Sequence, residues 1–422
     1  MPLKVVFVDP LIRGHHIVHA VYACEWFIAT GHEVTFIAWN PHPALEPLAS
    51  LPMTMIYAGN GIRDDDGIDQ HTLRGQFRMR RVIRRAIDEA KRHDADVVHL
   101  LFLDWFLIGL LTALAFPPLG RGRARLYAAL YWTYFDRPAG EKRPVVMKVK
   151  YWLERRILRA LISPRGIEAL FVFSDETRNR LMARGVDTTR MAVIPDPVDV
   201  PSAVPEPQDA REEIGLPRGD RLFLFFGETR LDKGPDILLA ALPLVRGKCT
   251  VVFVGPPNGL VEEEFVQAKR TLPDHVHLVW RLERVPDADV AAFFAAADCV
   301  VLPYRRLHLG TSGAMQHAAA YGRPIIVSDV GVLGDIARRH DLGLVVEPES
   351  PIALAKAIDA VVAMPVTQFE RQQEAARRYG AGNDWRVFGE QMRERFAADA
   401  ERRGRNVPTR ERQDRPPASS SS

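Results

Sequence analysis

The sequence has little cysteine and no long uninterrupted hydrophobic run. Its cysteines are Cys24, Cys249 and Cys299. Each lies in an apolar stretch and none pairs at a metal-binding or redox spacing, which excludes a disulfide framework and fits a reducing compartment. The most apolar segment, 97–116, is interrupted by polar residues such as Asp104, so it is interpreted as a buried strand and helix rather than a membrane span. The first eight residues are too short for a secretory signal, and we expect a cytoplasmic protein.

The sequence also lacks a strong excess of either charge. Its formal net charge is +3, with 26% charged and 47% hydrophobic residues, which is the balance of a globular protein. Gross charge therefore gives no reason to expect a nucleic-acid partner. A length of 422 residues predicts two or three domains. The phosphate-binding motifs G-x-x-x-x-G-K-[ST] and G-x-G-x-x-G are both absent.

Short apolar runs alternate with segments of helical periodicity in both halves of the chain. The expected strands are 4–9, 34–38, 96–101, 126–130 and 170–174, then 222–226, 250–254, 276–279, 299–302, 325–327 and 344–346. Strands that alternate with helices predict right-handed crossovers and a doubly wound parallel α/β sheet in each half. Between residues 195 and 217, closely spaced prolines predict an interdomain linker without regular structure. Two such sheets with their carboxyl edges facing each other would form a cleft for a ligand.

The strongest chemical signal is the segment 226–236, which reads F-G-E-T-R-L-D-K-G-P-D. A strand ends near Gly227, a short loop carries Arg230 and Lys233, and Gly234 precedes a helix. Two cations at a strand-to-helix turn with flanking glycines suit a diphosphate, because the backbone can approach closely and Arg binds phosphate oxygens in pairs. The alternative is a surface loop with solvated cations.

Two further strand-to-helix turns carry candidate residues. In the segment 302–324, Thr311, Ser312 and Gly313 precede an Ala-rich helix, where free backbone N–H groups could contact a second phosphate. A plain strand–helix unit is the alternative. After the first strand, Gly14 is followed by His15 and His16. These histidines are candidate polar contacts or proton carriers, or they merely cap the following helix.

Taken together, these motifs resemble the GT-B-fold retaining glycosyltransferases of family 4. In one branch of that family the second domain reads F-G-x-x-R-x-x-K-G, then P-Y-R, S-G and A-x-G-x-P. The matching positions here are Gly227, Arg230, Lys233, Gly234, 303–305, 312–313 and 320–324. In the first domain, the Gly-His-His segment 14–16 and the G-H-E-V segment 31–34 also match the family. The segment 194–199 resembles its interdomain I-P-N-G-V-D. The match extends in order over about residues 4–395.

The resemblance implies a GT-B architecture of two Rossmann-like domains facing each other across a cleft. Residues 1–200 would form the acceptor-side domain and 201–383 the donor domain. A helix at 384–400 would return to the first domain, and 401–422 would be a disordered tail rich in Arg, Pro and Ser.

The resemblance also implies the activity and the site. A sugar would pass from a UDP- or GDP-sugar to a glycan or lipid-linked acceptor, with retention and without a metal or another cofactor. Arg230 and Lys233 would stabilise the leaving diphosphate, with His15 and His16 as further catalytic candidates and Asp136 as a third possible base. The implied donor contacts are Gly14, Gly227, Arg230, Lys233, Gly255, Arg281, Leu282, Thr311, Ser312, Gly313, Gln316 and His317.

The sequence departs from the family in two places. Many members have a histidine at the end of a strand in the first domain, and the corresponding segment here, 131–136, has none. The other departure concerns a pair of positions. Many members carry two glutamates eight residues apart, and the corresponding residues here are Leu309 and His317. Gln316 or His317 could replace the missing carboxylate through hydrogen bonds. Two alternatives stay open. The missing glutamates allow a catalytically silent sugar-nucleotide-binding protein, and a sugar-nucleotide epimerase is the other, although the F-G-x-x-R-x-x-K-G arrangement speaks against it.

Residues 72–93 form a basic amphipathic pattern. Its apolar stripe consists of Leu73, Phe77, Val82, Ile83, Ala86, Ile87 and Ala90, and arginines occupy most of the remaining positions. Further basic residues are Lys142, Arg143, Lys148, Lys150, Arg155 and Arg156. A solvated helix face is one interpretation, and peripheral contact with an anionic membrane at its inner, cytoplasmic face is the other.

Overall fold

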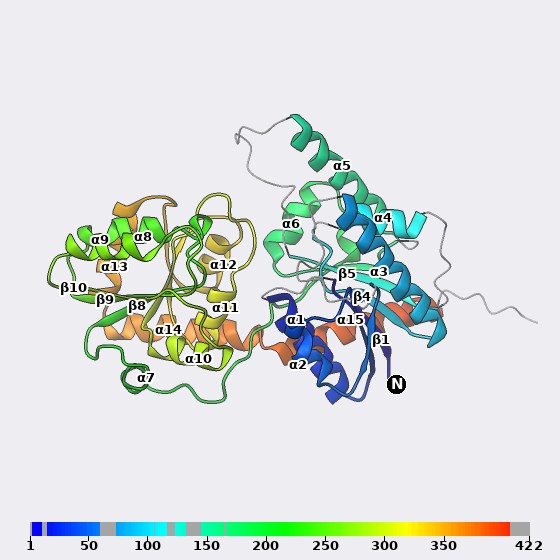
Figure 1. The fold of residues 1–422 in the computed structure, drawn as a ribbon, viewed down its shortest axis with the longest axis horizontal. Coiled ribbons are helices and arrows are strands. Elements are labelled where there is room, and N and C mark those ends of the chain that lie inside the picture. The colour runs from blue at the N-terminus through cyan, green and yellow to red at the C-terminus, as the bar shows by residue number, and fades with distance from the viewer. Residues whose placement is uncertain are drawn as a thin grey trace, which may run out of the picture.

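The computed structural model describes residues 2–10, 15–59, 73–104, 106–115, 123–131, 145–163 and 166–405. Each half of the chain forms a parallel sheet with helices on both faces (Figure 1). The continuous apolar runs account for this arrangement, because a parallel strand covered on both faces must be apolar on both.

The first domain contains a seven-stranded sheet of order β3-β2-β1-β4-β5-β6-β7. Its strands are β1 (Lys4–Val8), β2 (Glu33–Ala38), β3 (Thr54–Tyr57), β4 (Val97–Leu100), β5 (Arg125–Leu130), β6 (Ala169–Val172) and β7 (Met191–Val193). One face packs on α3 (Leu73–Arg92), α4 (Leu107–Ala115) and α5 (Val145–Leu161). The other face packs on α1 (His15–Ala29), α2 (Glu46–Ala49) and α15 (Trp385–Arg405). Helix α6 (Asp175–Ala183) connects β6 and β7.

The second domain contains a six-stranded sheet of order β10-β9-β8-β11-β12-β13. Its strands are β8 (Arg221–Phe226), β9 (Cys249–Val254), β10 (Val276–Arg281), β11 (Cys299–Leu302), β12 (Ile325–Ser328) and β13 (Gly343–Val346). Helices α7 (Pro207–Glu213), α10 (Asp287–Ala296), α11 (Gly313–Ala320) and α12 (Leu333–His340) share one core. Helices α8 (Pro235–Ala241), α9 (Glu262–Arg270), α13 (Pro351–Val362) and the start of α14 (Val366–Gly382) share the other.

Strand order determines where each sheet can bind a ligand. In the first sheet β1 lies between β2 and β4, and in the second β8 lies between β9 and β11. At both places the chain reverses the direction in which it adds strands. The crevice at such a switch point, beyond the carboxyl ends of the strands, is where open α/β sheets bind ligands. The loops after β1, β4, β8 and β11 are therefore the expected ligand-binding positions.

The C-terminal helix α15 is part of the first domain's core, although it follows the second domain in sequence. Phe388, Met392 and Phe396 are buried among residues of β1, β4 and α1. At Gly389, helix α15 approaches α1 so closely that a Cβ atom would overlap the Trp26 indole.

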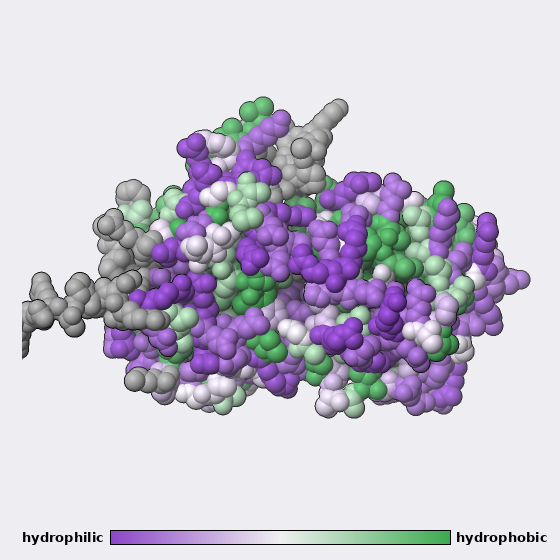
Figure 2. Space-filling view, turned by 180° about the vertical axis from the view of Figure 1, so that it is seen from behind, coloured by the Kyte–Doolittle hydropathy of each residue, from purple (hydrophilic) through white to green (hydrophobic). Residues whose placement is uncertain are grey.

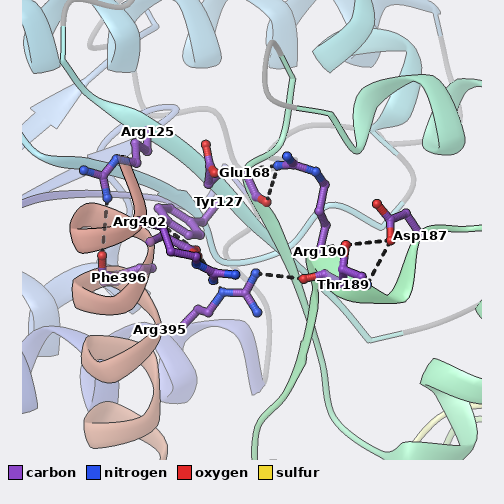
Figure 3. A network of polar contacts seen from close by, with 10 residues as sticks. Arg125, Tyr127, Glu168, Asp187, Thr189, Arg190, Arg395, Phe396 and Arg402 are labelled. Atoms are coloured by element: carbon purple, nitrogen blue, oxygen red, sulfur yellow. Dashed lines mark hydrogen bonds and ion pairs between the residues drawn. The ribbon is translucent and has the colours of Figure 1, made fainter. Parts of the chain in front are cut away.

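Polar contacts at the far end of α15 complete this docking (Figure 3). Tyr127 Oη donates to buried Asp399 Oδ2 at 3.3 Å, and Arg125 Nη1 donates to the Phe396 carbonyl at 3.4 Å. Arg395 Nη2 reaches the Thr189 carbonyl at 3.4 Å. The helix continues to Arg405, so residues 401–405 belong to a helix and not to a tail as expected. The rest of the expected tail, 406–422, lies outside the described residues.

The doubly wound fold class predicted from the sequence is confirmed, with two corrections to its elements. The short edge strands β3 and β7 were not predicted. The proline-rich segment contains helix α7, because Pro207 occupies the first turn, where a missing N–H costs nothing. The apolar stripe of α3 is buried in the core from Met79 to Ala90, whereas Phe77 near its start is 66% exposed.

Among the described helices, none is by itself both long and apolar enough to cross a membrane. Helices α13 and α14 meet the length and composition criteria only as a pair, and they are bent by 108° relative to each other.

Candidate functional site

The loops after β8 and β11 meet at the switch point of the second sheet. The Arg305 backbone N–H donates to the Asp232 carbonyl at 2.9 Å, and its Nε donates to the Leu231 carbonyl at 2.7 Å. At Gly234, which has a φ of 68°, a Cβ atom would strike the Pro303 carbonyl. Only glycine allows this approach. The two loops therefore form one surface, and the F-G-x-x-R-x-x-K-G and P-Y-R segments lie side by side.

Arg230 immediately precedes a single-turn 3-10 helix, η4 (Leu231–Lys233), and Lys233 is its last residue. The Arg230 guanidinium is held by Asp232 through two bonds of 2.9 and 2.8 Å. Lys233 differs, since within the described part of the chain no carboxylate oxygen lies within ion-pair distance of its ammonium group. Burial, and then the neighbouring Arg230 charge, lower the pKa of Lys233. The site thus holds a partly desolvated cation whose charge an incoming anion would stabilise.

Two glycines keep this cation close to the ends of the strands. Gly227 has a φ of 122°, and a Cβ atom there would collide with Lys233 Nζ. Gly255 has a φ of 137°, and its Cβ would collide with the Gly227 carbonyl. Both positions require glycine for backbone conformation as well as space. Gly255 thus packs against the backbone of Gly227, and it contributes to this surface through its backbone.

The beginning of α11 forms the second wall of the surface. Ser312 caps the helix by accepting from the Met315 backbone N–H at 3.4 Å, and its hydroxyl pairs with Tyr304 Oη at 2.9 Å. His308 packs edge-on against Tyr304, and burial lowers the pKa of His308 to about 4. A Cβ atom at Gly313 would meet nothing within 4 Å. The helix start is therefore held rigidly and is open above Gly313.

A buried carboxylate from the interdomain segment faces the same helix. Asp196 accepts from Gln316 Nε2 at 3.5 Å and from the Thr311 side chain. Gln316 also contacts Tyr379 Oη at 3.4 Å. Thr311 and Gln316 are thus brought together, and their common partner is a residue that the sequence did not single out as a site residue.

Two histidines of α1 contact carboxylates here: His19 contacts Asp196, and His16 contacts Asp9. His19 Nε2 lies 3.5 Å from Asp196 Oδ1, and its Nδ1 is hydrogen-bonded to Tyr131 Oη. One turn earlier, His16 Nδ1 lies 3.0 Å from Asp9 Oδ2, directly after β1. His16 also stacks on Phe102, after β4, with ring centroids 3.5 Å apart. His16 therefore lies at the switch point of the first sheet, as its position after β1 predicts.

Other predicted site residues cannot be placed or point elsewhere. Gly14, the His15 side chain and Asp136 lie outside the described residues. Arg281 donates to the Ile214 carbonyl and lies 5.2 Å from the Phe293 ring centroid. Leu282 packs against the core that α8, α9 and α13 share. The His317 ring stacks on that of Phe294, with centroids 5.1 Å apart. Leu309 is buried. These side chains are engaged within the second domain and are not gathered around Lys233.

The domains also meet at a cavity of about 410 Å³ between the start of α6 and helices α12 and α14. Its charged residues are already paired, because Arg339 bridges Asp175 and Glu176. Lys233 and Arg230 do not line this cavity. In the described part of the chain, no group of three or more His, Cys, Asp or Glu side chains is placed to hold a metal ion.

Protonation of Asp196 should make stability depend on pH. Burial raises the pKa of Asp196 from 3.8 to about 6, although bonds from Thr311 and Gln316 oppose the shift. The folded protein therefore retains a proton that the unfolded chain releases, and stability falls as pH rises from about 4 to about 6. Asp196→Asn should remove this dependence and gain on the order of 2–3 kcal/mol relative to wild type over that interval.

Chemical denaturation of both proteins across this pH range measures the effect. The other titratable side chains facing Asp196 are His19, Tyr131 and Tyr379, and they are unchanged in the variant. Asp274→Asn, at an exposed position, is the control and should follow wild type. Parallel pH profiles for Asp196→Asn and wild type would contradict the assignment.

Comparisons with known proteins find a glycosyltransferase domain in each half of the chain. The model described as "Glycosyl transferase 4-like domain" matches residues 17–197, and "Glycosyl transferases group 1" matches residues 220–364. The D-inositol 3-phosphate glycosyltransferase of Xylanimonas cellulosilytica is 30% identical over 200 residues, which are 45% of this chain and 47% of the relative. The chain thus matches about half the length of such curated relatives.

Solved structures show the same fold over nearly the whole chain. Sucrose-phosphate synthase from Thermosynechococcus elongatus has a TM-score of 0.70 at 18% identity, over 94% of this chain and 100% of that one. HepE from Anabaena, solved in complex with UDP, has a TM-score of 0.69 at 16% identity, over 94% and 100%.

Two doubly wound domains with facing switch points define a GT-B protein. Its two halves match the two glycosyltransferase domain models, which together cover most of the chain, and it belongs to the glycosyltransferase family 4-like proteins.

Proposed function

We propose that this protein transfers a sugar from a nucleoside diphosphate sugar to an acceptor, and that Lys233 and Arg230 bind the donor diphosphate. The observation that carries the proposal is the state of Lys233. It is a partly buried cation with a lowered pKa, beside a second cation, at the switch point of a doubly wound sheet. An anion bound there offsets the cost of burying the charge, and a diphosphate can reach both cations.

The chemistry assigned to these residues follows from charge development. Transfer breaks the bond between the anomeric carbon and the terminal phosphate oxygen, and negative charge accumulates on the departing diphosphate. Fixed cations at that position stabilise the transition state more than the ground state. Arg230 is oriented beforehand by Asp232, so its geometry requires little rearrangement when the donor binds. Two cations supply the neutralisation that a metal ion supplies elsewhere, and the proposed reaction uses no metal.

The proposed donor and acceptor sides differ in character. UDP is our first choice of nucleotide, because HepE was solved with UDP and with UDP-glucose, and GDP is the second. The acceptor, a glycan or a lipid-linked molecule, would bind on the first-domain side near His16. The Asp9–His16 pair is a candidate for handling the acceptor proton. Retention of anomeric configuration is proposed from the family resemblance.

Nucleotide binding provides the first test. Saturating UDP or GDP is expected to stabilise the folded protein, because a ligand that binds only this state stabilises it by about 2.7 kcal/mol at 100 times its Kd. Thermal unfolding with UDP, GDP, ADP and inorganic phosphate measures the response. A response to phosphate alone would indicate an unspecific anion site. No response to any nucleotide would overturn the donor-site proposal.

The silent-binder alternative has one observation in its favour. Neither Leu309 nor His317 supplies a carboxylate, since Leu309 is buried and His317 packs on Phe294. The two functions separate when the protein is incubated with donor sugar and candidate acceptors. A transferase releases nucleoside diphosphate in an acceptor-dependent manner, whereas a silent binder is stabilised by the donor and releases none.

A further inference from the structure

Helix α5 carries an apolar face that the protein leaves in water. Val145, Val149, Trp152 and Leu153 recur at spacings of three or four residues, so they lie on one side of the helix. Their exposed fractions are 74%, 57%, 49% and 43%. The opposite side, with Leu158 and Leu161, is buried in the first domain's core. The exposed face is thus not part of the fold's own packing.

The described charged residues that α5 itself places beside this face are positive. Lys148 and Arg156 are exposed beside the apolar residues, and the Arg156 guanidinium lies 4.3 Å from the Trp152 ring centroid. The acidic residue in the helix, Glu154, is on the buried side with Lys150 3.9 Å away. The surface therefore combines aliphatic side chains, an indole and cations, with no carboxylate from α5 among them.

The position of α5 leaves this face accessible. The helix projects from the body of the first domain (Figure 1), and hydrophobic and hydrophilic side chains lie together at the projecting end (Figure 2). In the basic helix α3 the apolar stripe from Met79 to Ala90 is in the core, and Phe77 is an isolated exposed apolar side chain. Of the two basic helices, α5 is therefore the one in which several exposed apolar side chains form a continuous face.

We propose that α5 is a membrane-docking helix that lies in the interface of an anionic bilayer. Apolar side chains and an indole gain by entering the acyl boundary, and flanking Lys and Arg gain near anionic headgroups. A second copy of the chain fits less well, since a symmetric contact through this face would bring the Lys148 and Arg156 charges of both copies together. The proposal does not depend on the donor site.

Vesicle co-sedimentation tests the proposal. The probes are vesicles of phosphatidylcholine alone and vesicles that also contain phosphatidylglycerol. Wild type should bind the anionic vesicles more tightly, and added salt should weaken the binding. The double variant Val149→Ser, Trp152→Ser should bind at least about tenfold more weakly, because two exposed side chains that insert would be lost. Phe77→Ser, at another exposed apolar position, in α3, is the matched control and should bind like wild type.

The outcomes distinguish a membrane-docking helix from a subunit interface and from a loss of folding. All substituted side chains are exposed, and a retained thermal midpoint and nucleotide response would show that the fold and the donor site are intact. The proposal is overturned if wild type binds neither vesicle, or if the double variant binds as well as wild type. It is also overturned if wild type is a dimer in solution and the double variant is a monomer, since the face would then be a subunit interface.

Discussion

Lys233→Met is expected to lower the turnover number for sugar transfer by about 100- to 1000-fold, the usual cost of removing one group that stabilises developing negative charge. Methionine keeps an unbranched side chain, one heavy atom shorter than that of lysine, and removes the charge. The stabilisation by nucleotide should shrink in parallel, because the diphosphate loses one of its two cations. Initial rates with saturating donor and thermal unfolding with and without nucleotide measure the two effects.

The same variant should be more stable than wild type when no ligand is bound. The pKa of Lys233 is lowered in the folded protein, so below that pKa the charged amine opposes folding, and an uncharged side chain removes the cost. Lys248→Met is the control, since Lys248 is exposed and lies 3.4 Å from Asp220, outside the site. Equal nucleotide responses in Lys233→Met and wild type would show that the diphosphate binds elsewhere.

The fold could be predicted from sequence because its signals are local. A strand buried on both faces is a continuous apolar run, and the runs at β8, β9 and β11 are of this kind. Strands β3 and β7 are short edge strands of four and three residues that are mostly only partly buried, so they lack such a run and were missed. Helix periodicity predicted α3 and its apolar stripe correctly, but it left open whether that stripe meets the core or a membrane. That depends on tertiary packing, and α5 shares the same basic amphipathic pattern with an apolar face left exposed.

The donor side of the site was predictable for a similar reason. Gly227, Arg230, Lys233 and Gly234 lie close together in one loop, and their backbone requirements are visible as glycines at fixed spacing. The contacts of the Asp196 carboxylate could not be predicted from the sequence. This carboxylate meets His19 and Gln316, which are 177 and 120 residues away in sequence, and only the docking of the two domains brings them together. No local pattern in the sequence encodes that contact.

The role of α15 leads to the second large expected effect. Phe396→Ala should destabilise the first domain by about 3–5 kcal/mol, the typical cost of removing a buried phenyl ring. The Phe396 side chain is 1% exposed. Its ring centroid lies 4.5 Å from that of Tyr127 and 5.8 Å from that of Phe171. Alanine would leave a cavity between the helix and the strands β5 and β6, which the rigid sheet cannot close.

Denaturant unfolding combined with hydrogen exchange can localise this loss. Amides of α15 and of strands β4 to β6 should lose protection in Phe396→Ala, whereas amides of β8 to β13 should not, because the ring is part of the first domain's core alone. Phe77→Ala is the matched control. Its ring is 66% exposed, and its removal should change the free energy of unfolding by less than about 0.5 kcal/mol. Unchanged protection of α15 in Phe396→Ala would mean that the helix does not depend on this aromatic contact.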